Sequence, residues 1–182
     1  SIAKTNVDRM LKLVNQLLDF NKLENDPLRL EVADTDVPAL LRDVTMSFAL
    51  AAKYKHIEFT TVGFEMPFGA PADADKLIKI YCNLLSNALK FTPKGGRIKV
   101  KFDIAETASG RRMVLIVENT GRRIPSDKLE KIFQRYYQLE DDGHRNESTV
   151  AGSGIGLYYA RALAELHHGS LRAVQPEAEG AC

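Results

Sequence analysis

The order of apolar and polar side chains along the chain predicts a succession of helices and strands. Apolar residues recur at helical spacing over residues 1–24, which predicts one long amphipathic helix there. Its apolar face requires a partner, and no second long helix precedes it. Beyond this helix, the pattern predicts strands over residues 28–32, 57–62, 67–69, 97–104, 113–117 and 170–174, and helices over residues 36–53, 126–136 and 157–168.

The clearest strand signal lies in residues 97–104, where apolar and polar side chains alternate strictly. A turn at residues 107–110 leads from this strand into the apolar run at 113–117, so the two segments form a predicted hairpin. Helices packed on an antiparallel or mixed sheet form a two-layer α/β sandwich, so the predicted fold class is α+β. The long amphipathic helix precedes this sandwich in the chain.

Composition places the chain among ordinary globular proteins. Its 182 residues are 45% hydrophobic, which is enough to bury a core. A formal net charge of +1 gives no electrostatic footprint for nucleic acid, so we expect no nucleic-acid partner. The cysteines, Cys82 and Cys182, lie far apart, which fits a reducing compartment, and no segment resembles a signal peptide or a membrane span.

The most informative segment is a predicted helix whose apolar residues run from Leu77 to Leu89. Asp73 or Asp75 can cap its beginning. Asn83 and Asn87 lie one turn apart and Lys90 follows three residues later, so the three project from one side of the helix. Carboxamide oxygens and an ammonium group suit a metal ion and phosphate oxygens, whereas the alternative is a solvated helix face.

Two glycine-bearing segments follow this helix, at residues 119–125 and 152–157, with Phe133-Gln134-Arg135-Tyr136-Tyr137 between them. Glycines before a helix let the backbone approach phosphates, although a bare Gly-x-Gly-x-Gly is a weak signal. Taken together and in this order, the asparagine helix and these segments resemble the ATP-binding catalytic domain of sensor histidine kinases. This is the Bergerat-type nucleotide fold shared with gyrase-type and mismatch-repair ATPases.

The resemblance implies a domain organisation. Residues 1–25 would be the second helix of the dimerisation and phosphoacceptor hairpin, whose first helix is absent, and residues 26–182 the ATP-binding domain with its last strand truncated. The parent protein would then be a homodimer joined through this helix, and a membrane-anchored sensor with this domain in the cytoplasm. Its partners would be ATP, its own phosphoacceptor helix and a response-regulator receiver domain.

The resemblance also implies a site, with ATP and Mg²⁺ as cofactors. Asn87 would be the magnesium ligand, Asn83 would belong to the same site, and Lys90 would contact phosphates. No catalytic residue is implied within this chain, because the phosphoacceptor histidine lies outside it. Residues 140–151 would form a lid. The full set of implied nucleotide-binding residues is Asn83, Asn87, Lys90, Asn119, Gly121, Ile124, Tyr137, Gly152, Gly154, Ile155, Gly156 and Leu157.

The chain departs from the family pattern Asp-x-Gly-x-Gly at its first glycine segment. Asn119 stands in place of the aspartate that accepts the adenine amino proton, and a neutral acceptor is weaker than a charged one. Arg123 stands in place of the second glycine, where a positive φ would strain an arginine by about 1 kcal/mol or more and where its side chain would crowd the base. Gly121 and Ile124 keep the pattern.

We therefore expect the donor half of a protein-histidine kinase, which transfers the γ-phosphoryl group of ATP to a histidine outside this chain. Asn119 and Arg123 favour an alternative, a degenerate kinase domain that binds little ATP and acts as a signalling or docking module. A gyrase-like hydrolase is disfavoured, because residues 80–91 contain no Asp or Glu as general base.

Overall fold

The computed structural model describes residues 29–108, 110–139 and 153–175. Contacts divide the chain into two compact units, of which one is Glu31–Ile124 and the other includes Pro125 and the residues after it. We call them the sheet unit and the α4 unit. The helix predicted over residues 1–24 and the lid predicted over 140–151 lie outside the described residues. Within the described part, no helix is long and apolar enough to cross a membrane.

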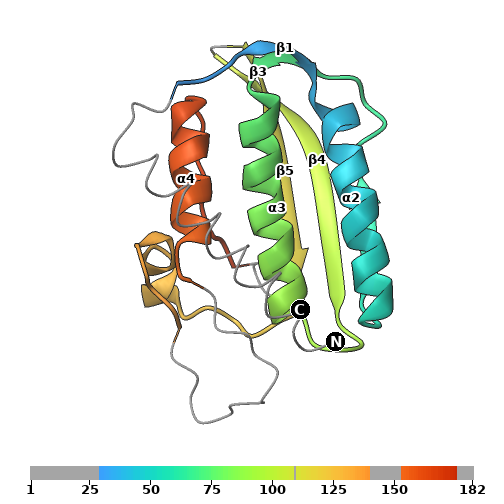
Figure 1. Ribbon diagram of the computed structural model, residues 1–182, viewed down its shortest axis with the longest axis vertical. Coiled ribbons are helices and arrows are strands. Elements are labelled where there is room, and N and C mark those ends of the chain that lie inside the picture. Colours follow the sequence, from blue (N-terminus) through green and yellow to red (C-terminus); the bar gives the residue numbers. More distant parts are fainter. Residues whose placement is uncertain (1–28, 109, 140–152, 176–182) are drawn as a thin grey trace, which may run out of the picture. The chain divides into compact units, whose positions relative to one another are not determined.

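The sheet unit is a two-layer arrangement, in which two helices cover one face of a three-stranded sheet (Figure 1). The helices are α2 (Val37–Tyr54) and α3 (Ala74–Phe91). In the sheet, β4 (Arg97–Thr107) lies between β2 (Glu58–Val62), which is parallel to it, and β5 (Gly110–Asn119), which is antiparallel. The predicted two-layer sandwich and its hairpin are confirmed.

A second, two-stranded sheet pairs β1 (Ala33–Asp36) with β3 (Gly69–Ala72). Both strands begin later than predicted: the prediction of a strand over residues 28–32 is wrong, and the strand predicted over residues 67–69 is shifted to Gly69–Ala72. The Glu31 N–H donates to the Asp73 carboxylate at 2.8 Å instead of to a neighbouring strand. Pro67 has no N–H with which to extend a ladder.

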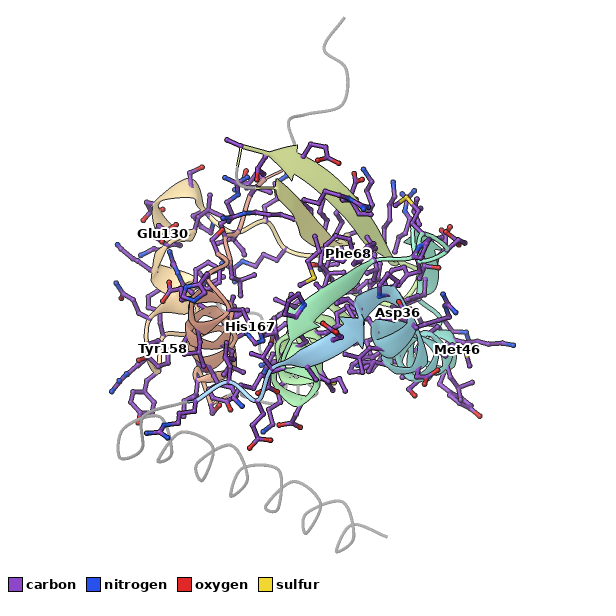
Figure 2. All side chains as sticks on the ribbon, turned by 90° about the horizontal axis from the view of Figure 1, so that it is seen from above. Asp36, Met46, Phe68, Glu130, Tyr158 and His167 are labelled. Carbon is purple, nitrogen blue, oxygen red and sulfur yellow. The ribbon has the colours of Figure 1, made fainter. Side chains whose placement is uncertain are left out.

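The core of the sheet unit is centred on β4. Ile98, Val100 and Phe102 are each 0% exposed, as their alternation predicts. The Phe102 ring centroid lies 5.8 Å from that of Phe64 and 6.1 Å from that of Phe68, which Figure 2 labels. The residues of the helices that are at most 1% exposed include Val37, Leu41, Tyr81 and Leu85.

One buried polar contact joins α2 to α3. The Thr45 hydroxyl donates to the Leu41 carbonyl at 2.7 Å, and it lies 2.7 Å from the Tyr81 hydroxyl, which is left to act as the donor between the two side chains. Burial raises the pKa of Tyr81 to about 12. The tyrosine therefore stays protonated, and this contact fixes how the two helices align.

Two aspartates begin the two helices. The Asp36 carboxylate accepts from the Ala39 N–H at 3.3 Å and caps α2, as predicted. Asp73, rather than Asp75, caps α3: it is 2% exposed and accepts from the Lys76 N–H at 3.0 Å. Burial alone raises the pKa of the Asp73 carboxyl, but hydrogen bonds from Lys76 and from the Glu31 backbone outweigh it, and the pKa falls to about 2.

Among its described residues, the α4 unit has two short 3-10 turns and the helix α4 (Gly156–Leu166). The prediction of a helix over residues 126–136 is wrong, because only η1 (Ser126–Lys128) and η2 (Lys131–Phe133) form. A continuous helix is interrupted where Gln134 is extended and Tyr136 has a φ of 61°, which no α-helix accommodates.

The interior of the α4 unit holds an apolar cluster and a bridging arginine. Phe133, Ile155 and Leu163 are buried. Arg161 lies 4.8 Å from the Phe133 ring centroid and donates to the Glu130 carboxylate at 2.8 Å, so it ties α4 to η2. The strand predicted over residues 170–174 is absent: residues 170–175 belong to no strand among the described ladders.

Helices α2 and α4 end in the same way, each with a histidine in the left-handed conformation. His56 has a φ of 56° and His168 a φ of 57°. The following N–H groups close the helices, since Ile57 donates to Ala52 and Gly169 to the Ala164 carbonyl, each at 2.9 Å. This is the Schellman arrangement, in which the left-handed residue is usually glycine. In α4 a glycine, Gly169, directly follows the left-handed residue instead of occupying that position.

We expect Asp73→Asn to lower the free energy of unfolding at pH 7 by about 2 kcal/mol, because the variant loses a carboxylate whose pKa is depressed from 3.8 to about 2. Since the folded-state pKa is lowered, this stabilisation is present above pH 4 and is lost as the pH falls towards 2. Urea unfolding of both proteins across this range measures it. Asp75→Asn, at an exposed position of the same helix, is the control and should change stability little. An equal gap between wild type and Asp73→Asn at pH 2 and pH 7 would contradict this account.

Replacing the left-handed histidine of α4 should stabilise the chain. In His168→Gly the residue has no Cβ to be strained by the positive φ. We therefore expect the free energy of unfolding, measured by thermal unfolding, to rise by about 1 kcal/mol. The matched control is His167→Gly, because His167 has a φ of −78° and its ring lies 2.8 Å from the Leu163 carbonyl. That control should be neutral or destabilising, and a similar gain in both variants would show that backbone strain is not the cause.

Candidate functional site

Helix α3 carries the three polar residues that the sequence predicts on one stripe. Its buried face is continuous and consists of Leu77, Ile80, Tyr81, Leu85, Ala88 and Leu89. Asn83, Asn87 and Lys90 are all half-buried and lie off that face. The helix is therefore anchored by its apolar residues, while the stripe faces away from the core.

The two asparagines differ in their hydrogen bonds. The carboxamide nitrogen of Asn83 donates to the Lys79 carbonyl one turn earlier, at 2.9 Å. The Asn87 side chain has no hydrogen-bond partner among the described residues, although it is half-buried. Since no buried side-chain nitrogen or oxygen of the described residues lacks a partner, the unpaired polar atoms of Asn87 are accessible, and the carboxamide can meet an external ligand.

The chemistry of this stripe fits magnesium held together with phosphate oxygens. Mg²⁺ prefers oxygen ligands and often takes only one or two from the protein. Among the described residues, no group of three or more His, Cys, Asp and Glu side chains could hold a metal ion by itself. The carboxamide oxygen of Asn87 is a suitable single ligand. Lys90, whose Nζ lies 4.8 Å from the Phe91 ring centroid, supplies a cation beside it.

The first glycine segment lies against the end of α3. A Cβ at Gly121 would lie 2.4 Å from the Phe91 carbonyl oxygen and 2.7 Å from the carboxamide nitrogen of Asn119. Any side chain would therefore push the turn off the helix. From the sequence, Gly121 belongs to a segment expected to bind a nucleotide. The structure adds that Gly121 lies close to Phe91, the last residue of α3.

Asn119 is the final residue of β5 and pairs with Ile98 on β4. Directly paired residues share one face of a sheet, and Ile98 is 0% exposed, so Asn119 lies on the face covered by the helices. Its side chain forms no hydrogen bond with any described residue. The carboxamide is thus free to accept or donate at the rim of that layer.

Arg123 is not strained. It is absent from the non-glycine residues with positive φ, which are His56, Tyr136 and His168. The cost expected for an arginine at this position is therefore not incurred, and the expectation of strain is wrong. Arg123 is exposed, and the neighbouring Ile124 is half-buried.

Sequence reasoning missed Gly96, which supports the same turn. A Cβ at Gly96 would lie 2.7 Å from a Thr92 methyl group and 2.8 Å from the Thr120 hydroxyl. That hydroxyl accepts from the Arg97 N–H at 2.7 Å. The available signal in the sequence is the pair Gly95-Gly96, but by itself this pair indicates only a turn between α3 and β4.

The second glycine segment belongs to the α4 unit, and Gly152 lies outside the described residues. Gly154 has a φ of 70°, and a Cβ there would come within 2.7–3.0 Å of the Tyr136 backbone. The Tyr136 N–H donates to the Gly154 carbonyl at 3.0 Å, so the two left-handed residues hold each other. Helix α4 begins at Gly156 after a buried Ile155, without a side-chain cap.

The free amides at the start of α4 form a potential anion site. The first intrahelical bond there runs from the Tyr159 N–H to the Ile155 carbonyl, so the earlier amides, including that of Leu157, have no helical acceptor. Of the adjacent tyrosines, Tyr136 is 60% exposed and Tyr137 is half-buried, so the buried aromatic of this segment is Phe133.

Comparison with known proteins identifies the family. Residues 72–182 match the sequence profile of the histidine kinase-, DNA gyrase B- and HSP90-like ATPases. "Histidine kinase P4" of Formosa agariphila is 31% identical over 98% of this chain, and "Sensor protein kinase WalK" of Staphylococcus epidermidis is 28% identical over 99% of it. The chain spans only 13% and 28% of the length of these two relatives.

Solved structures give the same result. Full-length ShkA in complex with AMPPNP superposes with a TM-score of 0.73 at 28% identity, over 91% of this chain and 32% of that one. Histidine kinase ThkA in complex with the response regulator TrrA gives 0.72 over 97% of this chain and 46% of that one, and at 22% identity it supports the fold alone. The resemblance carried by the asparagine helix and the glycine segments is confirmed. The chain belongs to the histidine kinase-, DNA gyrase B- and HSP90-like ATPase family, and it resembles the ATP-binding catalytic domain of sensor histidine kinases.

Proposed function

We propose that this domain binds ATP together with Mg²⁺ and holds its γ-phosphoryl group for transfer to a histidine outside the chain. The observation that carries the proposal is the half-buried, unpartnered carboxamide of Asn87 on a stripe with Lys90. The relative ShkA was solved with AMPPNP, an ATP analogue, which supports the same class of ligand here.

The proposed roles follow from the chemistry of each group. Asn87 would ligate the metal ion through its oxygen, with Asn83 one turn away in the same site. Bound Mg²⁺ would neutralise charge on the phosphates. Lys90 would supply a compact cation for phosphate oxygens. Phosphoryl transfer needs mainly positioning and charge stabilisation, so a rigid helix with fixed polar groups can perform this part.

The glycine segments would hold the rest of the nucleotide. Asn119 would accept the adenine amino proton through its amide oxygen, beside Gly121 and Ile124. The uncapped amides at the start of α4, next to Gly154, Ile155 and Gly156, would bind phosphate. Gly152, Tyr137 and Leu157 complete the proposed set.

The absence of strain at Arg123 weakens one of the two arguments for a degenerate docking module, because only crowding of the base by this side chain is left of it. The other argument, the neutral Asn119, concerns the strength of a single hydrogen bond. We therefore favour a working nucleotide site.

The proposal extends to the parent protein. Residues 1–25 would join two copies of the parent protein, and the domain would work in the cytoplasm of a membrane-anchored sensor. The relative ThkA was solved with a response regulator, which supports a receiver domain as the downstream partner. A phosphoacceptor helix from the same protein would receive the phosphoryl group.

Asn87→Ala should weaken magnesium-dependent ATP binding about tenfold or more, because one metal ligand is lost without any loss of core packing. Calorimetric titration with ATP, with and without Mg²⁺, measures the change. Ser86→Ala is the matched control, since the Ser86 hydroxyl is already bonded to the Asn83 carbonyl at 3.1 Å. Equal affinity of wild type and Asn87→Ala would contradict the site assignment.

Asn119→Asp should raise ATP affinity about fivefold, because a carboxylate accepts the adenine amino proton more strongly than an amide. Arg123→Gly should add little, since Arg123 is not strained, and the double variant should match Asn119→Asp. Arg122→Gly, at the neighbouring exposed position, controls for lost positive charge. A weaker affinity in Asn119→Asp would show that Asn119 does not contact the adenine amino group.

A further inference from the structure

The outer face of α2 is apolar where an amphipathic helix would be polar. Met46 is 65% exposed, Leu50 56% and Tyr54 80%, and they lie one turn apart along the helix. The buried residues Leu41, Thr45 and Ala52 lie on the opposite face, against the core. Figure 2 shows Met46 on the outer side of α2. The nucleotide site on α3 uses none of these residues.

The four positions 43, 46, 50 and 53 form a short heptad seam on this face, with spacings of three, four and three residues. Its two inner positions are apolar, Met46 and Leu50. Its two outer positions carry opposite charges, Asp43 and Lys53. Both charged residues are exposed, and neither forms an ion pair within the described part of the chain.

This seam is complementary to itself in one orientation. When two copies of α2 run antiparallel about a two-fold axis at position 48, Met46 of each copy faces Leu50 of the other. Asp43 of each copy then faces Lys53 of the other, so two apolar layers are flanked by two ion pairs. In a parallel pairing the aspartates would face each other and so would the lysines, which like-charge repulsion disfavours.

The surface next to the seam fits the same partner. An open depression is lined by Leu50, Lys53, Tyr54 and His56. In the antiparallel pairing, Met46 of the second copy lies over this depression, and a methionine adapts readily to an irregular gap. The left-handed turn at His56 shapes its far wall.

We propose that α2 is a self-association surface, which pairs antiparallel with α2 of a second copy through Asp43, Met46, Leu50 and Lys53. One helix-to-helix seam is smaller than the roughly 1,200–2,000 Å² buried in stable complexes, so the association is weak and observable at high micromolar concentration. It acts in addition to any dimerisation through other segments. It does not depend on nucleotide.

Charge reversal tests the pairing. Sedimentation equilibrium of the whole chain should show that Asp43→Lys and Lys53→Glu each weaken self-association about fivefold, because each variant places like charges opposite each other twice. The double variant should return to within about twofold of wild type. A partner of another kind, or a dimer formed only through other segments, would leave self-association the same in all these proteins, and that result would overturn the proposal.

The apolar layers are tested separately. Leu50→Ser should weaken self-association at least as much as a charge reversal, whereas Val62→Thr should not, although Val62 is a comparably exposed apolar residue (45%) on β2. Unchanged association in Leu50→Ser would also overturn the proposal. Thermal unfolding and ATP affinity equal to wild type in every variant would exclude misfolding as the cause.

Discussion

The rotation of α3 about its own axis is the constraint on which the site depends. Six residues of this helix are buried, including Tyr81 and Leu85 at 0% exposure. Each large apolar side chain contributes about 1.5–3 kcal/mol when it is buried, so turning the helix by one position would forfeit several such contributions. The buried residues of α3 therefore fix the direction in which Asn87 and Lys90 project. The buried contact between the Thr45 and Tyr81 hydroxyls and the cap formed by Asp73 further fix the position of α3.

The glycines of the site act first on the backbone. Gly121 is needed because its turn meets the Phe91 carbonyl, and Gly154 because it meets Tyr136 in a left-handed conformation. In both places the chain comes so close to itself that a Cβ would not fit. Gly121 thus lets the first glycine segment lie against the end of α3, and Gly154 lets the second lie against Tyr136.

Helices α2 and α3 depart from simple amphipathicity for different reasons. On α3 the unusual feature is an unpaired polar group at a half-buried position, which points to a ligand with hydrogen-bonding or metal chemistry. On α2 it is a row of exposed apolar residues bounded by opposite charges, which points to a partner with the same pattern in reverse. Both features lie off the core face, where packing imposes little choice of residue, so each is informative about binding.

Local signals in the sequence determined the regular elements. Periodicity placed the helices α2, α3 and α4 and the strands β2, β4 and β5, and aspartates marked the starts of α2 and α3. These signals depend on neighbours within a few residues. They failed for β1 and β3, whose pairing joins Ala33 to Ala72, and for residues 126–136, where contact with Gly154 puts Tyr136 into a conformation that no local pattern announces. The motifs also determined the family and the stripe of Asn83, Asn87 and Lys90. Only the tertiary structure decided that Asn87 is left unpaired, that Gly121 lies against Phe91 and that Arg123 is free of strain, because each depends on which distant backbone comes to lie beside it.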